Sequence, residues 1–105
     1  MAMRIDFFKE KIHEELEDAK EYMLYANETK KSHPYWANKF MKLGCEEMGH
    51  ANHLMSVLDE FNNSEERMKM PGFNPDQYQQ QYWAIMEDYS TMMPKITAMK
   101  ESFYK

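Results

Sequence analysis

The chain has 105 residues, the size of a single domain. Apolar residues make up 43% of it and aromatic residues 14%, which is enough for a packed core and excludes intrinsic disorder. A net charge of −5 disfavours nucleic acid and anionic membranes as partners. No apolar run reaches membrane-spanning length, the N-terminus lacks a signal-peptide pattern, and one cysteine forms no intrachain disulfide. These features predict a cytoplasmic protein.

The first predicted helix covers residues 3–31. Its apolar positions recur at alternating steps of three and four, the spacing that gathers side chains on one face of a helix. One glutamate and one tyrosine interrupt this otherwise apolar stripe. The stripe consists of Ile5, Phe8, Ile12, Glu15, Ala19, Tyr22 and Ala26.

The second predicted helix covers residues 34–62. Pro34 suits the first helical position, with Ser32 or His33 as the N-cap. The short connection predicts an antiparallel hairpin with the first helix, turning near residues 31–32. We expect its regularly spaced stripe to be buried in the bundle. The stripe consists of Trp36, Phe40, Leu43, Glu47, His50, Leu54, Val57 and Phe61.

The third predicted helix covers residues 75–104, with Asn74 as its N-cap, and Ser64 could cap a short helical turn before it. Pro94 lacks a backbone donor, so we expect it to kink or divide this helix. No alternating β pattern is present, which predicts one all-α domain over residues 1–105. The third stripe consists of Tyr78, Tyr82, Ile85, Tyr89, Met92, Ile96, Met99 and Phe103.

Three side chains in these stripes are ionisable where apolar side chains are expected. Glu15 lies in the first stripe, and Glu47 and His50 hold consecutive positions in the second. A buried carboxylate needs an opposite charge or a metal ion, and the three stripes contain no lysine or arginine. Glu15 and Glu47 are equally far from the turn, so a hairpin places them at the same height, with His50 one step further along. The pattern predicts half of a two-metal site.

The Glu-x-x-His spacing is not specific by itself, because the chain repeats it at Glu10 and His13. Those two lie off the first stripe, and we expect them to face water. The alternative interpretation of Glu47 and His50 is a core histidine that is hydrogen-bonded to a carboxylate. The matching height of Glu15 and the lack of a nearby cation favour the metal site.

The remaining polar and sulfur-containing residues are interpreted as structural or solvated. His53 falls beside the second stripe, and Cys45, which has no second cysteine, is a buried or partly exposed thiol. Twelve methionines indicate flexible core filler, with a methionine-lined groove as the alternative. Acidic residues near the proposed ligands are interpreted as solvated faces, with an approach path for cations as the alternative. These are Glu14, Glu17, Asp18, Glu21 and Glu46.

The segments EELEDAKEY and CEEMGHANHLMSVL resemble the two ligand-bearing helices of the ferritin-like superfamily, which includes ferritins and rubrerythrins. Glu15 with Tyr22 seven residues later is similar to the first of these helices. Glu47 is similar to the bridging carboxylate of the second, and His50 to its terminal ligand. The resemblance covers about residues 8–61. It implies a ferritin-like hairpin with a di-iron carboxylate site, with manganese or zinc as alternative metals.

A complete ferritin-like bundle carries two such half-sites, whereas this chain carries one. The part after residue 72 has no second Glu-x-x-His, and Glu87 lies off the third stripe. The chain therefore resembles most closely the encapsulated ferritins, short chains that assemble the site across a two-fold dimer interface. This implies a homodimer that completes a four-helix bundle around two irons, and it admits a larger ring and an encapsulating shell. The Glu15–Glu47 spacing is slightly longer than in that group, and the chain ends in MKESFYK without an obvious encapsulation tail.

The activity implied is oxidation of Fe(II) to Fe(III) by O₂ or peroxide, for iron detoxification or storage, with Tyr22 orienting a ligand or supplying an electron. An alternative of a different class is a helical structural or interaction protein, such as a phage or accessory protein, with a vestigial or purely structural site. That alternative predicts a Glu15–His50 hydrogen bond in a closed core. A third reading is a two-metal site without oxidase activity.

Overall fold

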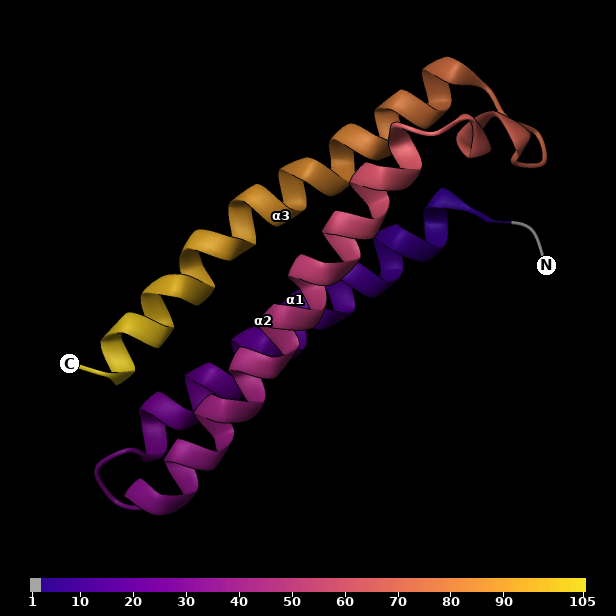
Figure 1. Cartoon of the computed structure of the whole chain (residues 1–105). Coiled ribbons are helices and arrows are strands. Elements are labelled where there is room, and N and C mark those ends of the chain that lie inside the picture. Colours follow the sequence, from indigo (N-terminus) through magenta and orange to yellow (C-terminus); the bar gives the residue numbers. More distant parts are fainter. Residues whose placement is uncertain (1–2) are drawn as a thin grey trace.

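A computed structural model describes residues 3–105 as three long α-helices and one short 3-10 helix, with no strand in that range. The helices are α1 (Ile5–Thr29), α2 (Pro34–Asn62), η1 (Glu65–Lys69) and α3 (Pro75–Phe103). The all-α prediction is confirmed. The molecule is elongated, with principal extents of 53 × 25 × 17 Å (Figure 1). No helix in the described range is both long and apolar enough to cross a membrane.

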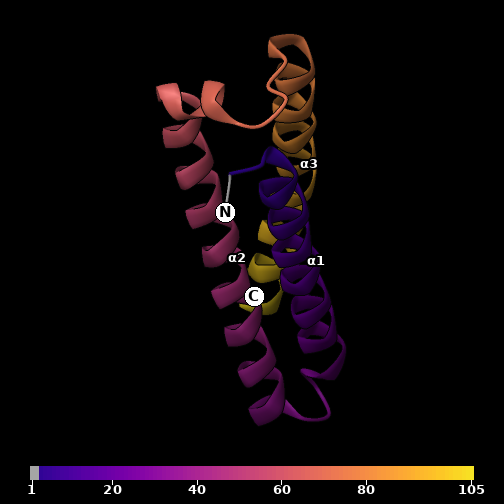
Figure 2. The ribbon, with the colours of Figure 1, turned by 90° about the vertical axis from the view of Figure 1, so that its right-hand side faces the viewer.

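Helix α1 is the centre of the structure, because both α2 and α3 pack against it. The turn at residues 30–33 folds α2 back antiparallel to α1, and η1 carries the chain from the end of α2 to the start of α3 (Figures 1 and 2). Helices α2 and α3 contact each other mainly through tyrosine hydroxyls of α3 that donate to polar side chains of α2. These pairs are Tyr78–Asn62, Tyr82–Asp59 and Tyr89–Asn52.

Helix α3 runs parallel to α1. Gln81 Nε2 donates to Asp6 Oδ1 at 3.2 Å, and His13 Nδ1 lies 2.9 Å from Asp88 Oδ2. The two pairs share one offset along the chain, 75 residues, and lie two helical turns apart. The side chains of Glu10 and His13 are both exposed, as predicted. His13 also contacts Asp88 of α3, which the sequence did not predict.

The far ends of α1 and α3 are held together by donors from α1. Asn27 Nδ2 donates to the Met99 carbonyl at 3.0 Å. The Lys30 ammonium donates to the Phe103 carbonyl and lies 5.1 Å from the centroid of its ring. These contacts satisfy carbonyls at the C-terminal end of α3 and place a cation where the helix dipole favours one.

The cores of α1 and α3 agree closely with the predicted stripes. Five apolar residues of the α1 stripe are buried, while Leu16 and Met23 fill the places expected for Glu15 and Tyr22, which lie at the edge. The methionines Met23 and Met41 are fully buried, in keeping with their interpretation as core filler. In α3 the fully enclosed members of the stripe are Tyr78, Ile85, Met92, Ile96 and Phe103.

The prediction that the whole α2 stripe is buried is wrong: Phe61 is buried, Phe40 and Leu54 are only partly buried against the core, and the other members lie at its edge or outside it. Trp36 is 60% exposed, Leu43 38% and Val57 41%, so this stripe lies on the outside of the hairpin. The face against α1 carries small residues at seven-residue steps, which let the two helices approach closely. The buried residues are Ala37, Met41, Gly44, Ala51, Met55, Leu58 and Phe61.

Side-chain caps begin η1 and α3 as the sequence suggests. The Ser64 hydroxyl accepts from Glu66 N at 3.2 Å, and Asn74 Oδ1 accepts from Gln77 N at 3.1 Å. His33 precedes α2 without a capping hydrogen bond from its side chain. Helix α3 is continuous through Pro94, so the proline does not divide this helix.

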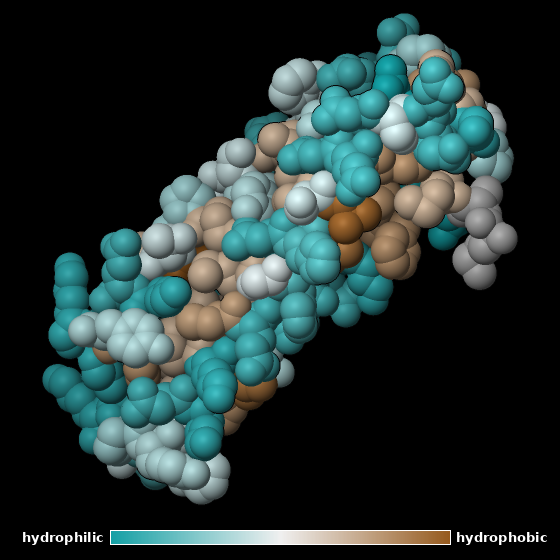
Figure 3. Space-filling model, in the orientation of Figure 1, coloured by the Kyte–Doolittle hydropathy of each residue, from teal (hydrophilic) through white to brown (hydrophobic). Residues whose placement is uncertain are grey.

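Figure 3 shows the side of the molecule on which α2 and α3 diverge. Brown and tan side chains run along the middle of this face, flanked by hydrophilic ones. Cys45 and Met48 of α2 and Met86, Met93 and Met99 of α3 are partly buried against the core. Three helices therefore leave apolar side chains incompletely covered.

Candidate metal centre

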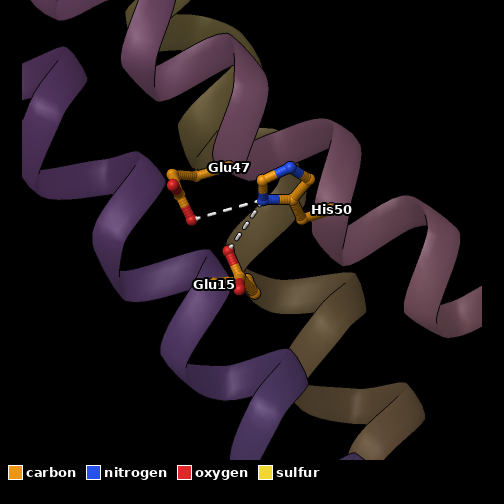
Figure 4. A group of neighbouring side chains, drawn as sticks. All are labelled: Glu15, Glu47 and His50. Atoms are coloured by element: carbon orange, nitrogen blue, oxygen red, sulfur yellow. Dashed lines mark ion pairs between the residues drawn. The ribbon is translucent and has the colours of Figure 1, made fainter.

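Glu15 of α1 and Glu47 and His50 of α2 lie together on the hairpin (Figure 4). His50 Nδ1 is 3.4 Å from Glu15 Oε2 and 3.7 Å from Glu47 Oε2. One ligand atom from each residue falls within 4.8 Å of the others, so the group could hold a metal ion. The structure thus brings together the three residues that the sequence singled out.

Two local features produce this convergence. Residues 47 and 50 are three apart in one helix and therefore project from the same face. Glu15 and Glu47 stand at equal chain distances from the turn at residue 31, so the antiparallel hairpin sets them side by side. No longer-range contact is needed to form the cluster.

The cluster lies at the edge of the core and not inside it, which corrects the predicted burial. The side chains of Glu15 and Glu47 are 20% and 22% exposed, whereas that of His50 is 61% exposed. The cause is the rotation of α2, which turns the second stripe outward. The carboxylates are sheltered by the two helices, and the imidazole faces the outside.

His50 forms an ion pair with each carboxylate when it is protonated (Figure 4), but no fixed positive charge pairs with them within residues 3–105. No lysine or arginine there forms an ion pair with Glu15 or Glu47, and Lys11 pairs with Glu14 at 3.5 Å instead. Glu15 Oε2 is inaccessible to solvent and accepts no hydrogen bond. A buried oxygen without a donor is rare in proteins and indicates a missing cation, proton or water.

The pKa of Glu47 is raised above its ordinary value of 4.5. The largest cause is that a proton on Glu47 would hydrogen-bond to Glu15; burial and the negative charge of Glu15 follow, and His50 acts in the opposite direction. When both carboxylates are ionised there is no proton to share, which agrees with the unsatisfied oxygen of Glu15. The pair therefore favours uptake of a positive charge.

A groove of about 390 Å³ adjoins the cluster on the outside of the hairpin. Three apolar side chains form much of its wall, next to the ligand atoms of two cluster members. The presence of Lys11 in this groove was not predicted, because Lys11 lies outside the predicted stripes. The lining consists of Phe7, Lys11, Glu15, His50, His53, Leu54 and Val57.

The other candidate residues take different positions around the cluster. His53 lines the groove but is not among the three clustered ligands, and Cys45 is partly buried. Tyr22 is partly buried on α1, and within residues 3–105 no hydrogen bond joins it to either carboxylate. The pKa of Asp18 is raised above its ordinary value, first by burial and then by the negative charge of Glu47.

The donor set suits a hard or borderline divalent cation. Carboxylate oxygens and an imidazole nitrogen are common ligands of iron, manganese and zinc. A cation placed among them would give Glu15 Oε2 the partner that it lacks. Three protein ligands from one side leave further coordination positions open.

The stability of the metal-free protein is expected to respond to pH through Glu47. Because its pKa is raised on folding, its favourable contribution is complete below about pH 4.5 and is lost as the pH rises through the folded-state pKa. The difference in Tm between Glu47→Gln and the parent should therefore grow from pH 4 to pH 8 in the presence of EDTA. A difference that stays constant over this range would contradict the coupling of the two carboxylates.

Comparison of the chain with models of protein families, with curated proteins and with solved structures finds no match. The ferritin-like resemblance therefore rests on the ligand residues and their spacing.

Proposed function

We propose that this protein is a ferritin-like, iron-oxidising homodimer. Each subunit supplies Glu15, Glu47 and His50, and the two sets face each other across a two-fold axis to hold two metal ions. The observation that carries this proposal is a carboxylate pair that no lysine or arginine of residues 3–105 neutralises, in which Glu15 Oε2 is buried and accepts no hydrogen bond. A divalent cation supplies what the pair lacks.

A second copy is the natural complement of the cluster. The three ligands lie on one side of the site, and the imidazole faces outward. Exposed apolar side chains lie on the same outer face of the hairpin, before and after the cluster along α2. We name this surface the hairpin face, and it consists of the exposed Phe7 of α1, the exposed Trp36, Leu43 and Val57 of α2, and the partly buried Leu54. Large exposed apolar surfaces mark interfaces, and joining two such faces would enclose both clusters.

The geometry argues against the principal alternative, a closed structural core. That alternative requires a hydrogen bond between Glu15 and His50 away from solvent. His50 Nδ1 instead lies 3.4 Å from Glu15 Oε2 without forming a hydrogen bond, and the ring is mostly exposed. A cluster of this kind is suited to receive a ligand.

Fe(II) is the substrate in this proposal, and two Fe(II) lose one electron each while O₂ takes up two electrons and two protons to give H₂O₂. Glu15 and Glu47 bind the cations and neutralise their charge. His50 supplies a neutral nitrogen donor, and the nearby Asp18 raises the local cation concentration. Tyr22, on α1 beyond the carboxylates, is proposed to orient a ligand or to supply an electron.

Anaerobic titration with Fe(II), followed by exposure to air, tests the proposal. We expect two Fe(II) bound per dimer and a rapid rise of Fe(III) absorbance when O₂ is admitted. Glu10→Gln is the matched control, because Glu10 belongs to the second Glu-x-x-His pair and is exposed, so it should bind and oxidise iron like the parent. Less than one iron per dimer would refute the proposal, and binding without oxidation would leave a two-metal site without oxidase activity.

A further inference from the structure

Gly44 lies at the closest approach of α1 and α2. It is buried in α2 one turn before Glu47, and it faces Ala19 and Met23, which follow Glu15 by one and two turns. A Cβ atom at Gly44 would lie 2.6 Å from Met23 Cγ and 3.3 Å from the Ala19 carbonyl oxygen. Met23 and Ala19 are themselves fully enclosed. A side chain at this position would therefore require the Met23 side chain to move and the Ala19 carbonyl to shift by a few tenths of an ångström.

This close approach bears on the ligand cluster, because a helix is nearly rigid over one turn. To admit a Cβ at Gly44, the Met23 side chain would have to move by most of an ångström, and α1 would have to retreat by a few tenths of an ångström at Ala19. Glu15 and Glu47 are on these same two helices, a single turn away. Metal–ligand distances tolerate deviations of only about 0.2 Å. An increase of a few tenths of an ångström in the distance between α1 and α2 would therefore be enough to disturb metal coordination.

Gly49 provides the contrast within the same helix. It lies between Glu47 and His50, and a Cβ added there would meet nothing within 4 Å. Both glycines weaken the helix in the same way, since glycine in a helix interior is less favourable than alanine. Only at Gly44 does the missing side chain allow α1 and α2 to pack closely together.

We infer that Gly44 is a positioning residue, which sets the α1–α2 separation at which Glu15, Glu47 and His50 bind one cation. The inference rests on the proposed metal-binding function. Gly44 touches no metal ligand directly; it acts through the distance between the helices that carry the ligands.

The experiment compares Gly44→Ala with Gly49→Ala by anaerobic Fe(II) calorimetry. We expect Gly44→Ala to weaken Fe(II) binding about tenfold or more while the helical circular dichroism stays unchanged. Gly49→Ala should bind within about twofold of the parent and unfold at a higher temperature, as expected for alanine in an unobstructed helix position. Equal affinities of the two variants would overturn the inference.

A rescue variant separates positioning from stability. Met23→Ala removes both Met23 atoms that would meet the new Cβ, so Gly44→Ala/Met23→Ala should regain most of the affinity although it loses core packing. If the double variant binds no better than Gly44→Ala, the role of Gly44 is structural only, and the inference fails. If Gly44→Ala does not fold, the double variant is compared with the parent instead, and loss of its Fe(II) binding overturns the inference.

Crystal structures of the metal-free parent and Gly44→Ala test the inference independently of iron. The Cα–Cα separation of residues 15 and 47 should increase by several tenths of an ångström in the variant. An unchanged separation overturns the inference even if iron binds. If the parent itself binds no iron, the proposed function fails, and the measured separation alone decides whether Gly44 sets the geometry of the cluster.

Discussion

Replacing Glu47 with glutamine is expected to weaken Fe(II) binding by about 100-fold or more, because even loss of a residue that only orients a ligand costs 10- to 100-fold. In a two-fold dimer the substitution removes one ligand from each subunit. The same change should raise the Tm of the metal-free protein, since it removes a carboxylate that is disfavoured beside Glu15. Binding and metal-free stability therefore change in opposite directions.

Calorimetry with Fe(II) and thermal unfolding in EDTA measure the two effects separately. The matched control is Glu10→Gln, which has the same chemistry at an exposed Glu-x-x-His pair. It should leave both quantities near those of the parent. A Glu47→Gln variant that binds iron as tightly as the parent would remove Glu47 from the site.

Placing a charge on the hairpin face is expected to dissociate the dimer. Val57 is 41% exposed in the single chain, so Val57→Lys should cost the isolated subunit little. Enclosed in an interface, an unpaired ammonium is costly, and we expect the dimer Kd to rise about 100-fold or more. Iron binding should weaken in parallel, because in the proposed dimer each subunit supplies only half of the ligands.

Sedimentation equilibrium gives the Kd, and iron titration of the same samples gives the stoichiometry. Trp83→Lys is the control, since Trp83 is 60% exposed but lies on α3, away from the hairpin face. It should remain dimeric. If Trp83→Lys dissociates the protein and Val57→Lys does not, the interface lies on α3, and the proposed two-fold arrangement is wrong.

The hairpin and its cluster were predictable because they depend on local rules. A turn near residue 31 and equal chain distances fix the heights of Glu15 and Glu47, and three-residue spacing aligns Glu47 with His50. Neither relation needs knowledge of the tertiary contacts. The sequence accordingly identified the three residues that the structure brings together.

The buried face of α2 was not predictable in the same way, because this helix carries two regular stripes. One contains large residues such as Trp36 and Leu43, and the other contains the small residues Ala37, Gly44 and Ala51. Because its side chains are larger and more hydrophobic, the stripe with Trp36 and Leu43 is the one expected to be buried. The structure buries the second, because the gain from a close helix approach depends on what α1 presents opposite it.

The contacts of α3 could not be predicted from the sequence patterns. The prediction gave its stripe but not its partner or direction, since its pairs with α1 join residues more than seventy positions apart. The hydrophobic periodicity of α1 and α3 does not reveal polar contacts between them, such as the one between His13 and Asp88. Their positions follow only from the assembled fold.

The parallel arrangement of α1 and α3 also has a kinetic consequence. The hairpin forms from contacts across a short turn, whereas the pairs of α3 with α1 join residues about seventy-five positions apart, such as His13 and Asp88. We therefore expect the hairpin to fold first and α3 to dock last. All three ligands belong to the hairpin, so the cluster can form before the longest-range contacts of the chain are made.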